Sequence, residues 1–429
     1  MSRPAAWALP ETPAHREMLL RARVVVPITQ PPIENGVVRV TGARIRAVGR
    51  WRDLRRDVGE VVDLGDVALL PGLVNAHCHL DYTGMAGLFP PPRRFTDWLK
   101  LITATKGQWS DEDFAQSWRE GAAMLLRNGV TTVGDVEAVP ALLPAAWEAT
   151  PLRVFSFLEM TGIRSRRQPR QVLEEAMSHI GRLRHRRNRA WLSPHAPYST
   201  LPELVTLAAR AARRRRWRIT MHVAESDQEF EMFRHAQGEM HEWLARNERD
   251  NRDCGLGSPV EHLERCGALH PSLLAIHVNY LAPGDAGRLG RAGVHVVHCP
   301  RSHAFFRHQA FPYEALLAAG VNLCLATDSL ATVEKPHRQP VELDLFAEMR
   351  AFAARFPQVA PEHLIRMVTV NPARALGQAG CLGEIRAGAC ADLIAIPFRA
   401  RATAVHEGLL AHTGPVRASL IGGRWALRA

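Results

Sequence analysis

The stretch GLVNAHCHLDYTG, residues 72–84, places an apolar run directly before two histidines that are separated by a single cysteine. An apolar run of this kind is typical of a β-strand that is buried on both faces. Successive side chains on a strand point to opposite sides, so His77 and His79 face one space and Cys78 faces away. We therefore expect the two histidines to act together at a strand end and the cysteine to pack.

Seven further strand-like runs follow, and amphipathic segments such as FAQSWREGAAMLLRNG (114–129) and PELVTLAARAARRRR (202–216) separate most of them. Strands that alternate with helices indicate a parallel sheet buried on both faces. Eight such strands close most simply into a (β/α)8 TIM barrel of the α/β class. The predicted strands cover residues 68–77, 131–135, 153–159, 190–195, 218–223, 273–278, 294–299 and 321–328.

The two ends of the chain differ from its middle, because short alternating strands and glycine turns replace the long helical patterns. Residues 1–67 contain ARVVVPITQ and NGVVRVTGARIRAVGRW, and residues 376–429 contain GCLGEIRAGACADLIAIPF and PVRASLIGGRWALRA. We expect both ends to build one small β-sandwich subdomain beside a barrel that spans residues 68–375.

The 429-residue chain is 46% hydrophobic and carries a formal net charge of +11, and its basic side chains are almost all arginines. The lysines are Lys100, Lys106 and Lys335. A basic protein can attract nucleic acid, but the runs RLRHRRNR (182–189) and RRRRWR (213–218) lie beside helix-like sequence without regularly spaced aromatic residues. We therefore expect a solvated arginine surface and no specific nucleic-acid partner.

Cysteine usage and the opening residues bear on the compartment. The seven cysteines form no CxxC pair, and residues 1–18 lack the apolar core of a signal peptide. An uninterrupted apolar run of about 18 residues, which a spanning helix would need, is not found either. These features favour the reducing cytoplasm and predict no membrane partner.

Ionisable residues recur at the carboxyl ends of the predicted strands. In a (β/α)8 barrel these ends form the active-site face, so residues far apart in the sequence become neighbours there. Three imidazoles and one carboxylate form a donor set that suits zinc, or iron or manganese, and leave a position for water. The residues at strand ends are His77, His79, Glu159, His195, His222, Glu225, His277 and Asp328.

These motifs resemble the amidohydrolase superfamily and, within it, the mononuclear deaminase branch. PGLVNAHCHL (71–80) resembles the first-strand signature, and further matches are HVAES (222–226), IHV (276–278), ATDS (326–329) and NPARALG (371–377). The resemblance covers nearly the whole chain. Binuclear members use a carboxylated lysine at the fourth strand, but AWLSPHAPYST (190–200) contains none, so one divalent ion is implied.

The resemblance implies a role for each matching residue. His77, His79, His222 and Asp328 would bind the ion, preferably Zn²⁺, with Fe²⁺ or Mn²⁺ as alternatives. Asp328 would also take a proton from the attacking water, while Glu225 would move protons on the substrate and His277 would orient the water. Milder alternatives stay open, since Glu225 and Asp328 could each cap a helix and His277 could be a fifth ligand.

Three further residues are candidates for contact with the substrate. SPHAPYST (193–200) resembles the segment in which relatives present a histidine, here His195, although it could be a structural turn. FTDWLK (95–100) resembles the loop whose aromatic side chain covers the pocket, so Trp98 could stack on a flat ring or pack in a helix core. HCPRSHAFF (298–306) has His303 where relatives often carry an amide.

The resemblance implies a hydrolytic deaminase that releases ammonia from an aromatic heterocycle. Aminofutalosine-type and adenosylhomocysteine/methylthioadenosine-type deaminases look most similar, which indicates an adenine-type nucleoside or base. The same centre could also hydrolyse a triazine halide, deaminate guanine-like rings or open a cyclic amide, because fold and metal site do not choose among these reactions. A barrel that only binds a ligand is a further alternative, and the resemblance suggests a homodimer.

Overall fold

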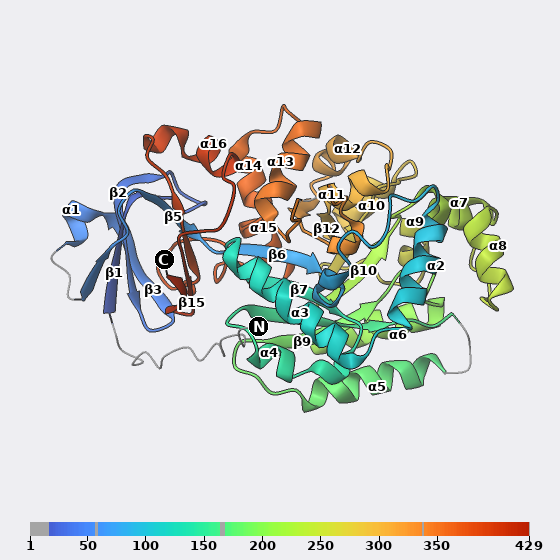
Figure 1. Cartoon of the computed structure of the whole chain (residues 1–429). Helices are drawn as coiled ribbons and strands as arrows, with labels where there is room; N and C mark the ends of the chain where they lie inside the picture. Colours follow the sequence, from blue (N-terminus) through green and yellow to red (C-terminus); the bar gives the residue numbers. More distant parts are fainter. Residues whose placement is uncertain (1–16, 56–58, 164–167, 337–338, 429) are drawn as a thin grey trace.

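The computed structural model describes residues 17–55, 59–163, 168–336 and 339–428. Most of the opening segment that bears on a signal peptide lies outside these ranges, as does part of a third arginine-rich run, RSRRQPR (164–170). Two sheets organise the described chain (Figure 1). No helix in these ranges combines the length and the apolar character that crossing a bilayer requires.

One of the two sheets has eight parallel strands that follow one another in chain order and curve into a barrel. The predicted (β/α)8 fold is confirmed. Its strands are β6 (Leu73–Cys78), β7 (Val130–Glu137), β8 (Arg153–Met160), β9 (Arg189–Pro194), β10 (Ile219–Val223), β11 (Leu273–His277), β12 (His295–His298) and β13 (Asn322–Leu325). Apolar side chains such as Val74, Phe157 and Ile276 form one buried cluster, while a larger cluster joins the strands to the helices.

Helices follow most barrel strands and cover them. Local signals define where several begin: at α3, the Ser110 hydroxyl and the Asp113 carboxylate cap each other's backbone N–H groups. The α-helices are α1 (Trp51–Leu54), α2 (Phe95–Lys106), α3 (Asp111–Arg127), α4 (Ala145–Glu148), α5 (Pro169–Arg182), α6 (Pro202–Arg215), α7 (Asp227–His235), α8 (Glu239–Arg246), α9 (Pro259–Arg265), α10 (Asp285–Arg291), α11 (Pro300–Phe305), α12 (Tyr313–Ala318), α13 (Leu345–Arg355), α14 (Pro361–Met367), α15 (Val370–Ala375) and α16 (Val405–Leu410).

The second sheet joins the two ends of the chain, as expected for the β subdomain. It has mixed pairing in the order β16-β15-β14-β5-β1-β2-β3, and β4 pairs with β1. Its strands are β1 (Glu17–Val25), β2 (Ile33–Thr41), β3 (Arg44–Arg50), β4 (Glu60–Asp63), β5 (Val67–Pro71), β14 (Leu393–Pro397), β15 (Ala418–Ile421) and β16 (Arg424–Arg428). The boundaries at residues 67 and 376 stay predictions.

The first predicted barrel strand, residues 68–77, consists of two strands in different sheets. β5 pairs antiparallel with β14 in the second sheet, whereas β6 pairs with β7 in the barrel. Gly72 lies between them, and a Cβ atom there would be 2.0 Å from the Thr131 hydroxyl oxygen. Glycine therefore lets the chain pass close to β7 as it leaves one sheet for the other.

The barrel closes between its first and last strands through a small set of contacts. Cys78 and Asp328 form an isolated parallel bridge. The Asn75 side chain joins the same seam, because its Nδ2 donates to Thr327 Oγ1 at 2.7 Å and its Oδ1 accepts from Thr327 N at 3.2 Å. This closure brings the residue after β13 against the histidines that follow β6.

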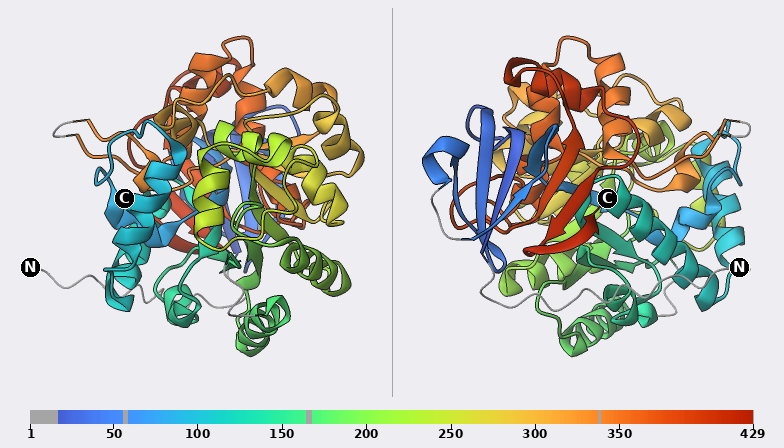
Figure 2. Two further views of the ribbon diagram at one scale, coloured as in Figure 1. Left: turned by 90° about the vertical axis from the view of Figure 1, so that its right-hand side faces the viewer. Right: turned by 60° about the vertical axis from the view of Figure 1, so that its left-hand side comes forward.

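The carboxyl ends of the barrel strands face away from the β subdomain. In Figure 1 the β6 arrow points to the right, while the subdomain lies at the left. Figure 2 presents that right-hand end, where α7 and α8 cross in front of the strands and α2 lies beside them. Any site at the strand ends is therefore built by barrel loops and these helices.

Candidate active site

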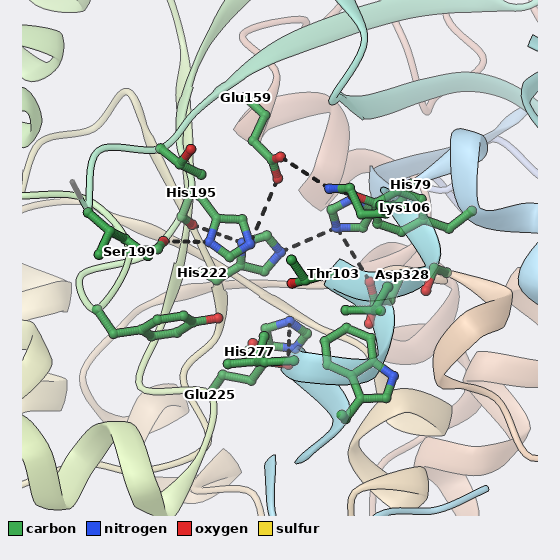
Figure 3. A pocket seen from close by; sticks show the side chains of 18 of the residues that line it. His79, Thr103, Lys106, Glu159, His195, Ser199, His222, Glu225, His277 and Asp328 are labelled. Carbon is green, nitrogen blue, oxygen red and sulfur yellow. Dashed lines mark hydrogen bonds and ion pairs between the residues drawn. The ribbon is translucent and has the colours of Figure 1, made fainter. Parts of the chain in front are cut away.

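Four histidines and one aspartate from distant parts of the chain meet at the strand ends. His77 lies in β6 and His79 follows it, His222 lies in β10, His277 ends β11, and Asp328 follows β13. Asp328 Oδ1 lies 3.4 Å from His77 Nε2 and 3.7 Å from His79 Nε2. The Nε2 atoms of His79 and His222 are 3.3 Å apart (Figure 3). The structure thus brings together all five residues that the sequence placed there.

The donor atoms of this cluster fit a divalent metal ion. Those of His77, His79 and Asp328 lie within 4.8 Å of one another, as do those of His77, His222 and His277. Both ring nitrogens of His77 are buried and make no hydrogen bond within the described chain. Burial lowers the pKa of His79 and of His277 to about 3, so both rings are neutral. Neutral imidazoles with free nitrogens are what metal binding requires.

Neighbouring groups orient two members of the cluster. His222 Nδ1 lies 2.9 Å from the backbone oxygen of His195, which directs Nε2 toward the other imidazoles. The Thr332 hydroxyl donates to Asp328 Oδ2 at 3.0 Å and leaves Oδ1 facing the histidines. β6 shifts register against β7 between Asn75 and Cys78, a bulge of the kind that re-aims side chains.

The backbone is strained where it presents these groups. Ala224, His277 and Asp328 have φ values of 49°, 71° and 54°, in the left-handed region that favours glycine. Such conformations cost roughly 1–3 kcal/mol each and persist where surrounding structure enforces them, often at functional sites.

The carboxylate of Glu229 fixes the backbone of the loop after β10, which carries Glu225. Glu229 accepts hydrogen bonds from Ala224 N at 3.0 Å and from Glu225 N at 2.8 Å. Ser226, and not Glu225, caps α7, because its hydroxyl accepts from Glu229 N. The capping alternative for Glu225 is therefore wrong, since its side chain lies instead beside the His277 ring, with Oε1 3.5 Å from Nε2.

Burial favours the protonated form of Glu225. Its side chain is buried, and this burial together with the nearby carboxylates of Asp328 and Glu229 raises its pKa well above the ordinary value. A protonated carboxylic acid at neutral pH can donate a proton to a substrate. Asp328 likewise caps no helix, since the residue before the short 3₁₀ turn Leu330–Thr332 is Ser329.

A cavity of about 330 Å³ opens onto the cluster. Trp98 and Leu99 of α2 and Trp243 and Leu244 of α8 form much of its apolar wall, and His195 also lines it. Trp98 packs on Phe306 with ring centres 5.2 Å apart, and its stacking on a flat ring stays a prediction. An apolar cavity with few polar groups suits a small organic molecule.

The polar wall of this cavity contains residues that the sequence did not assign to substrate. Glu159, noted only as a strand-end residue, lies 3.7 Å from Lys106 Nζ and 3.8 Å from His195 Nε2. His195 Nδ1 is 2.6 Å from the Ser199 hydroxyl (Figure 3). Burial acts to raise the pKa of Glu159, but the ammonium of Lys106 and the His195 imidazole lower it to about 2. The sequence has only three lysines, and this scarcity was the one signal that could have marked Lys106 as a candidate for the site.

His303 lies elsewhere. It is in α11, which begins directly after β12, and it lines a second cavity with His298 and His308. Because the chain turns into a helix at Pro300, the His303 ring contacts His298 of β12 and His308 after α11, and it is not among the lining residues of the cavity described above.

Cys78 packs away from the cluster, as its position between two histidines predicted. It is fully buried among apolar residues of the strand–helix interface, and burial raises its pKa well above the ordinary value. We expect Cys78→Ser to keep both metal content and turnover and to lower stability by about 1 kcal/mol. Thermal unfolding and metal analysis of the variant measure this, and metal loss would contradict the assignment.

Comparisons with known proteins agree with this geometry. The amidohydrolase family profile matches residues 68–423. The 5-methylthioadenosine/S-adenosylhomocysteine deaminase of Syntrophobacter fumaroxidans is 31% identical over 379 residues, which cover 85% of this chain and 80% of that protein. The aminodeoxyfutalosine deaminase of Deinococcus radiodurans is 28% identical over 356 residues, covering 80% of this chain and 81% of that protein.

Solved structures share the fold. The adenosine deaminase of Xanthomonas campestris with bound zinc has a TM-score of 0.81 at 24% identity and covers 97% of this chain and 94% of that one. The Helicobacter pylori aminofutalosine deaminase in complex with methylthio-coformycin has a TM-score of 0.84 at 20% identity, covering 96% of this chain and all 100% of that one. The resemblance inferred from the sequence motifs is confirmed, and the chain belongs to the amidohydrolase family.

Proposed function

We propose that this protein is a metal-dependent hydrolase of carbon–nitrogen bonds that releases ammonia from an adenine-type nucleoside. The observation that carries the proposal is the buried cluster of imidazoles and Asp328 beside a protonated Glu225 at a cavity of about 330 Å³. The names of the relatives support the substrate class, since they include methylthioadenosine/adenosylhomocysteine, 5'-deoxyadenosine and aminodeoxyfutalosine deaminases.

The ion would be held by His77, His79, His222 and Asp328, and we propose Zn²⁺. Nitrogen and oxygen donors in this number suit zinc, and the Xanthomonas campestris structure contains it. Bound there, such an ion would lower the pKa of a water molecule toward about 7 and would so supply hydroxide at neutral pH. His277 stays a proposed partner of the attacking water, although its nitrogen also lies within 4.8 Å of those of His77 and His222.

Two carboxyl groups divide the proton transfers. Asp328, whose Oδ1 faces the imidazoles, accepts the proton of the attacking water. Glu225, whose raised pKa favours the protonated form, gives its proton to the ring nitrogen next to the attacked carbon and then takes up the proton of the new hydroxyl group as the carbonyl forms. Asp328 passes the proton that it took from the water to the amine, which leaves as ammonia. The Glu225–His277 contact of 3.5 Å keeps both groups on the same side of the cavity.

The remaining cavity walls suit a nucleoside. Trp98 offers a flat apolar face on which a heterocycle can stack. Glu159 is ionised, and its 3.7 and 3.8 Å contacts with Lys106 and His195 are too long to be hydrogen bonds. Its oxygens therefore remain available to accept hydrogen bonds from ribose hydroxyls, and His195 borders the same space.

A screen for product release tests the proposal. The zinc-loaded enzyme is offered adenine nucleosides with different 5' substituents, free adenine, guanine and chlorinated triazines, while ammonia and chloride are measured. We expect ammonia from adenine nucleosides, abolished by a chelator and restored by added metal ion. Chloride release alone, or no turnover of any adenine nucleoside by fully metallated protein, would refute it.

The Glu159→Gln variant tests the ribose assignment. We expect the kcat/KM for an adenine nucleoside to fall by about 10- to 100-fold, because a charged hydrogen-bond acceptor is lost. The 2',3'-dideoxy analogue should react equally with both proteins, and the exposed Glu174→Gln variant serves as control. Equal loss with both substrates would assign Glu159 a structural role.

Compartment and assembly are further proposals. All seven cysteines are free, which supports a reducing compartment such as the cytoplasm. The homodimer stays a prediction, and the mass of the protein in solution tests it.

A further inference from the structure

A second cavity of about 320 Å³ lies at the same end of the barrel as the active-site cavity, and no described residue lines both. The end of β12, the loop after α11 and the last turn of α13 surround this cavity. The helices α11 and α13 are neighbours in Figure 1. The two cavities lie beside adjacent parallel strands: His277, at the end of β11, lines the first, and His298, at the end of β12, lines the second. The catalytic scheme above uses none of its residues.

Three histidines of this cavity have ring nitrogens without partners. His298 Nδ1, His303 Nε2 and His308 Nε2 are buried and make no hydrogen bond within the described chain. The rings form a row, with centres 5.2 Å apart between His298 and His303 and 5.5 Å apart between His303 and His308. Buried polar atoms normally find partners, so three such nitrogens beside one cavity leave hydrogen-bonding capacity for water or for a bound molecule.

The charges around the cavity are positive. Arg307 and Arg355 line it, and no aspartate or glutamate is among its described lining residues. Arg307 has a φ of 55°, a left-handed conformation that glycine would adopt more easily. The loop after α11 therefore holds a guanidinium at the cavity despite the backbone cost.

Apolar rings complete the walls. Phe311, Phe352 and Phe356 are buried and line the cavity. The His298 ring stacks on Phe311 with centres 3.8 Å apart. The cavity therefore combines a basic, hydrogen-bonding side with an apolar side that fits a small planar group.

We propose that this cavity binds a small oxyanion, a carboxylate or phosphate group, between Arg307, Arg355 and the three imidazoles. Arginine presents paired N–H donors that match both kinds of oxyanion. Burial lowers the pKa of His303 to about 4 and that of His308 to about 3, so each neutral ring offers one N–H donor. The phenylalanine rings accommodate an apolar group attached to the anion.

A metal ion fits this cavity less well. The three imidazoles are absent from the described groups whose donor atoms lie within 4.8 Å of one another. Two guanidinium groups with no carboxylate beside them also repel a cation. The same arrangement attracts an anion.

Calorimetric titration of the zinc-loaded enzyme with inorganic phosphate and, separately, with benzoate tests the proposal. We expect at least one probe to bind with a Kd below about 10 mM and Arg355→Gln or Arg307→Gln to weaken it about tenfold or more. The matched Arg210→Gln variant, which changes an exposed arginine on α6, should bind as the parent does. Phosphate binding alone would indicate a phosphorylated ligand, and benzoate binding alone an aromatic carboxylate.

Crystals soaked in 4-bromobenzoate locate the bound probe through the anomalous signal of bromine. Bromine inside this cavity, against the rings of Phe311, Phe352 or Phe356, supports the site, whereas bromine only in the active-site cavity overturns it. Failure of both probes to bind, or binding that neither arginine variant weakens, overturns it as well. Turnover of Arg355→Gln without added anion should match that of the parent, which separates this site from catalysis.

Discussion

Replacing His222 with alanine is expected to remove both the bound metal ion and the deaminase activity. His222 Nε2 lies 3.3 Å from His79 Nε2, and its Nδ1 faces the His195 backbone oxygen at 2.9 Å, so its ring is held toward the cluster. Replacing a group that only orients a metal-binding residue lowers metal affinity or activity by about 10- to 100-fold. Removing the metal-binding residue itself should lower them by more than about 100-fold. Metal analysis and ammonia release measure the two effects.

The control for this variant is His235→Ala, which removes an exposed histidine at the end of α7. It should keep metal and turnover. Circular dichroism and thermal unfolding of His222→Ala separate metal loss from global unfolding. A folded His222→Ala protein with a full complement of metal would exclude His222 as a ligand, and His277 would then be the candidate for its place.

The Glu225→Gln variant should keep the metal ion and lose most of its turnover. Glutamine has nearly the same shape but cannot deliver a proton, so we expect kcat to fall by about 10²- to 10⁴-fold. Metal content should not change, because the role assigned to Glu225 is proton transfer to the substrate. Rapid measurement of ammonia release together with metal analysis tests both parts.

The pH profile gives an independent test of the same role. Burial, with Asp328 as a neighbour, raises the pKa of Glu225 well above its ordinary value, so the carboxyl group keeps its proton to a higher pH than a free glutamate does. It loses its proton as the pH rises through that raised pKa, and the rate should fall on this alkaline side. In Glu225→Gln this alkaline limb should vanish. The exposed Glu203→Gln variant should show the parent's rate and profile, and a fully active Glu225→Gln enzyme would remove Glu225 from the mechanism.

The barrel fold could be predicted from local sequence patterns, because each barrel strand is marked by an apolar run of only a few residues. The eight predicted runs match the eight strands of the barrel sheet, apart from residues 68–77, which divide between two sheets. Apolar runs predict buried strands, but the run before His77 does not reveal which sheet each half joins. Gly72 and its close approach to Thr131 decide that, and this contact is between segments far apart in the chain.

The candidate site was predictable to the extent that it lies at strand ends. Parallel strands share one carboxyl edge, so His77, His222 and Asp328 had to face the same mouth once the barrel was inferred. Glu159 ends a strand in the same way, but its pairing with Lys106 depends on how α2 lies over the mouth, which no local pattern encodes. The roles of these residues stay predictions.

By itself, the sequence determined the strand–helix alternation, the family and the identity of the residues at the strand ends, because these depend on side-chain periodicity and motif spacing. The tertiary structure alone decided the contacts that each of them makes. Closure of β6 against β13 through Asn75 and Thr327 places Asp328 beside the histidines. The helical turn at Pro300 carries His303 into a separate cavity. Such contacts depend on packing between segments hundreds of residues apart, which a linear pattern does not specify.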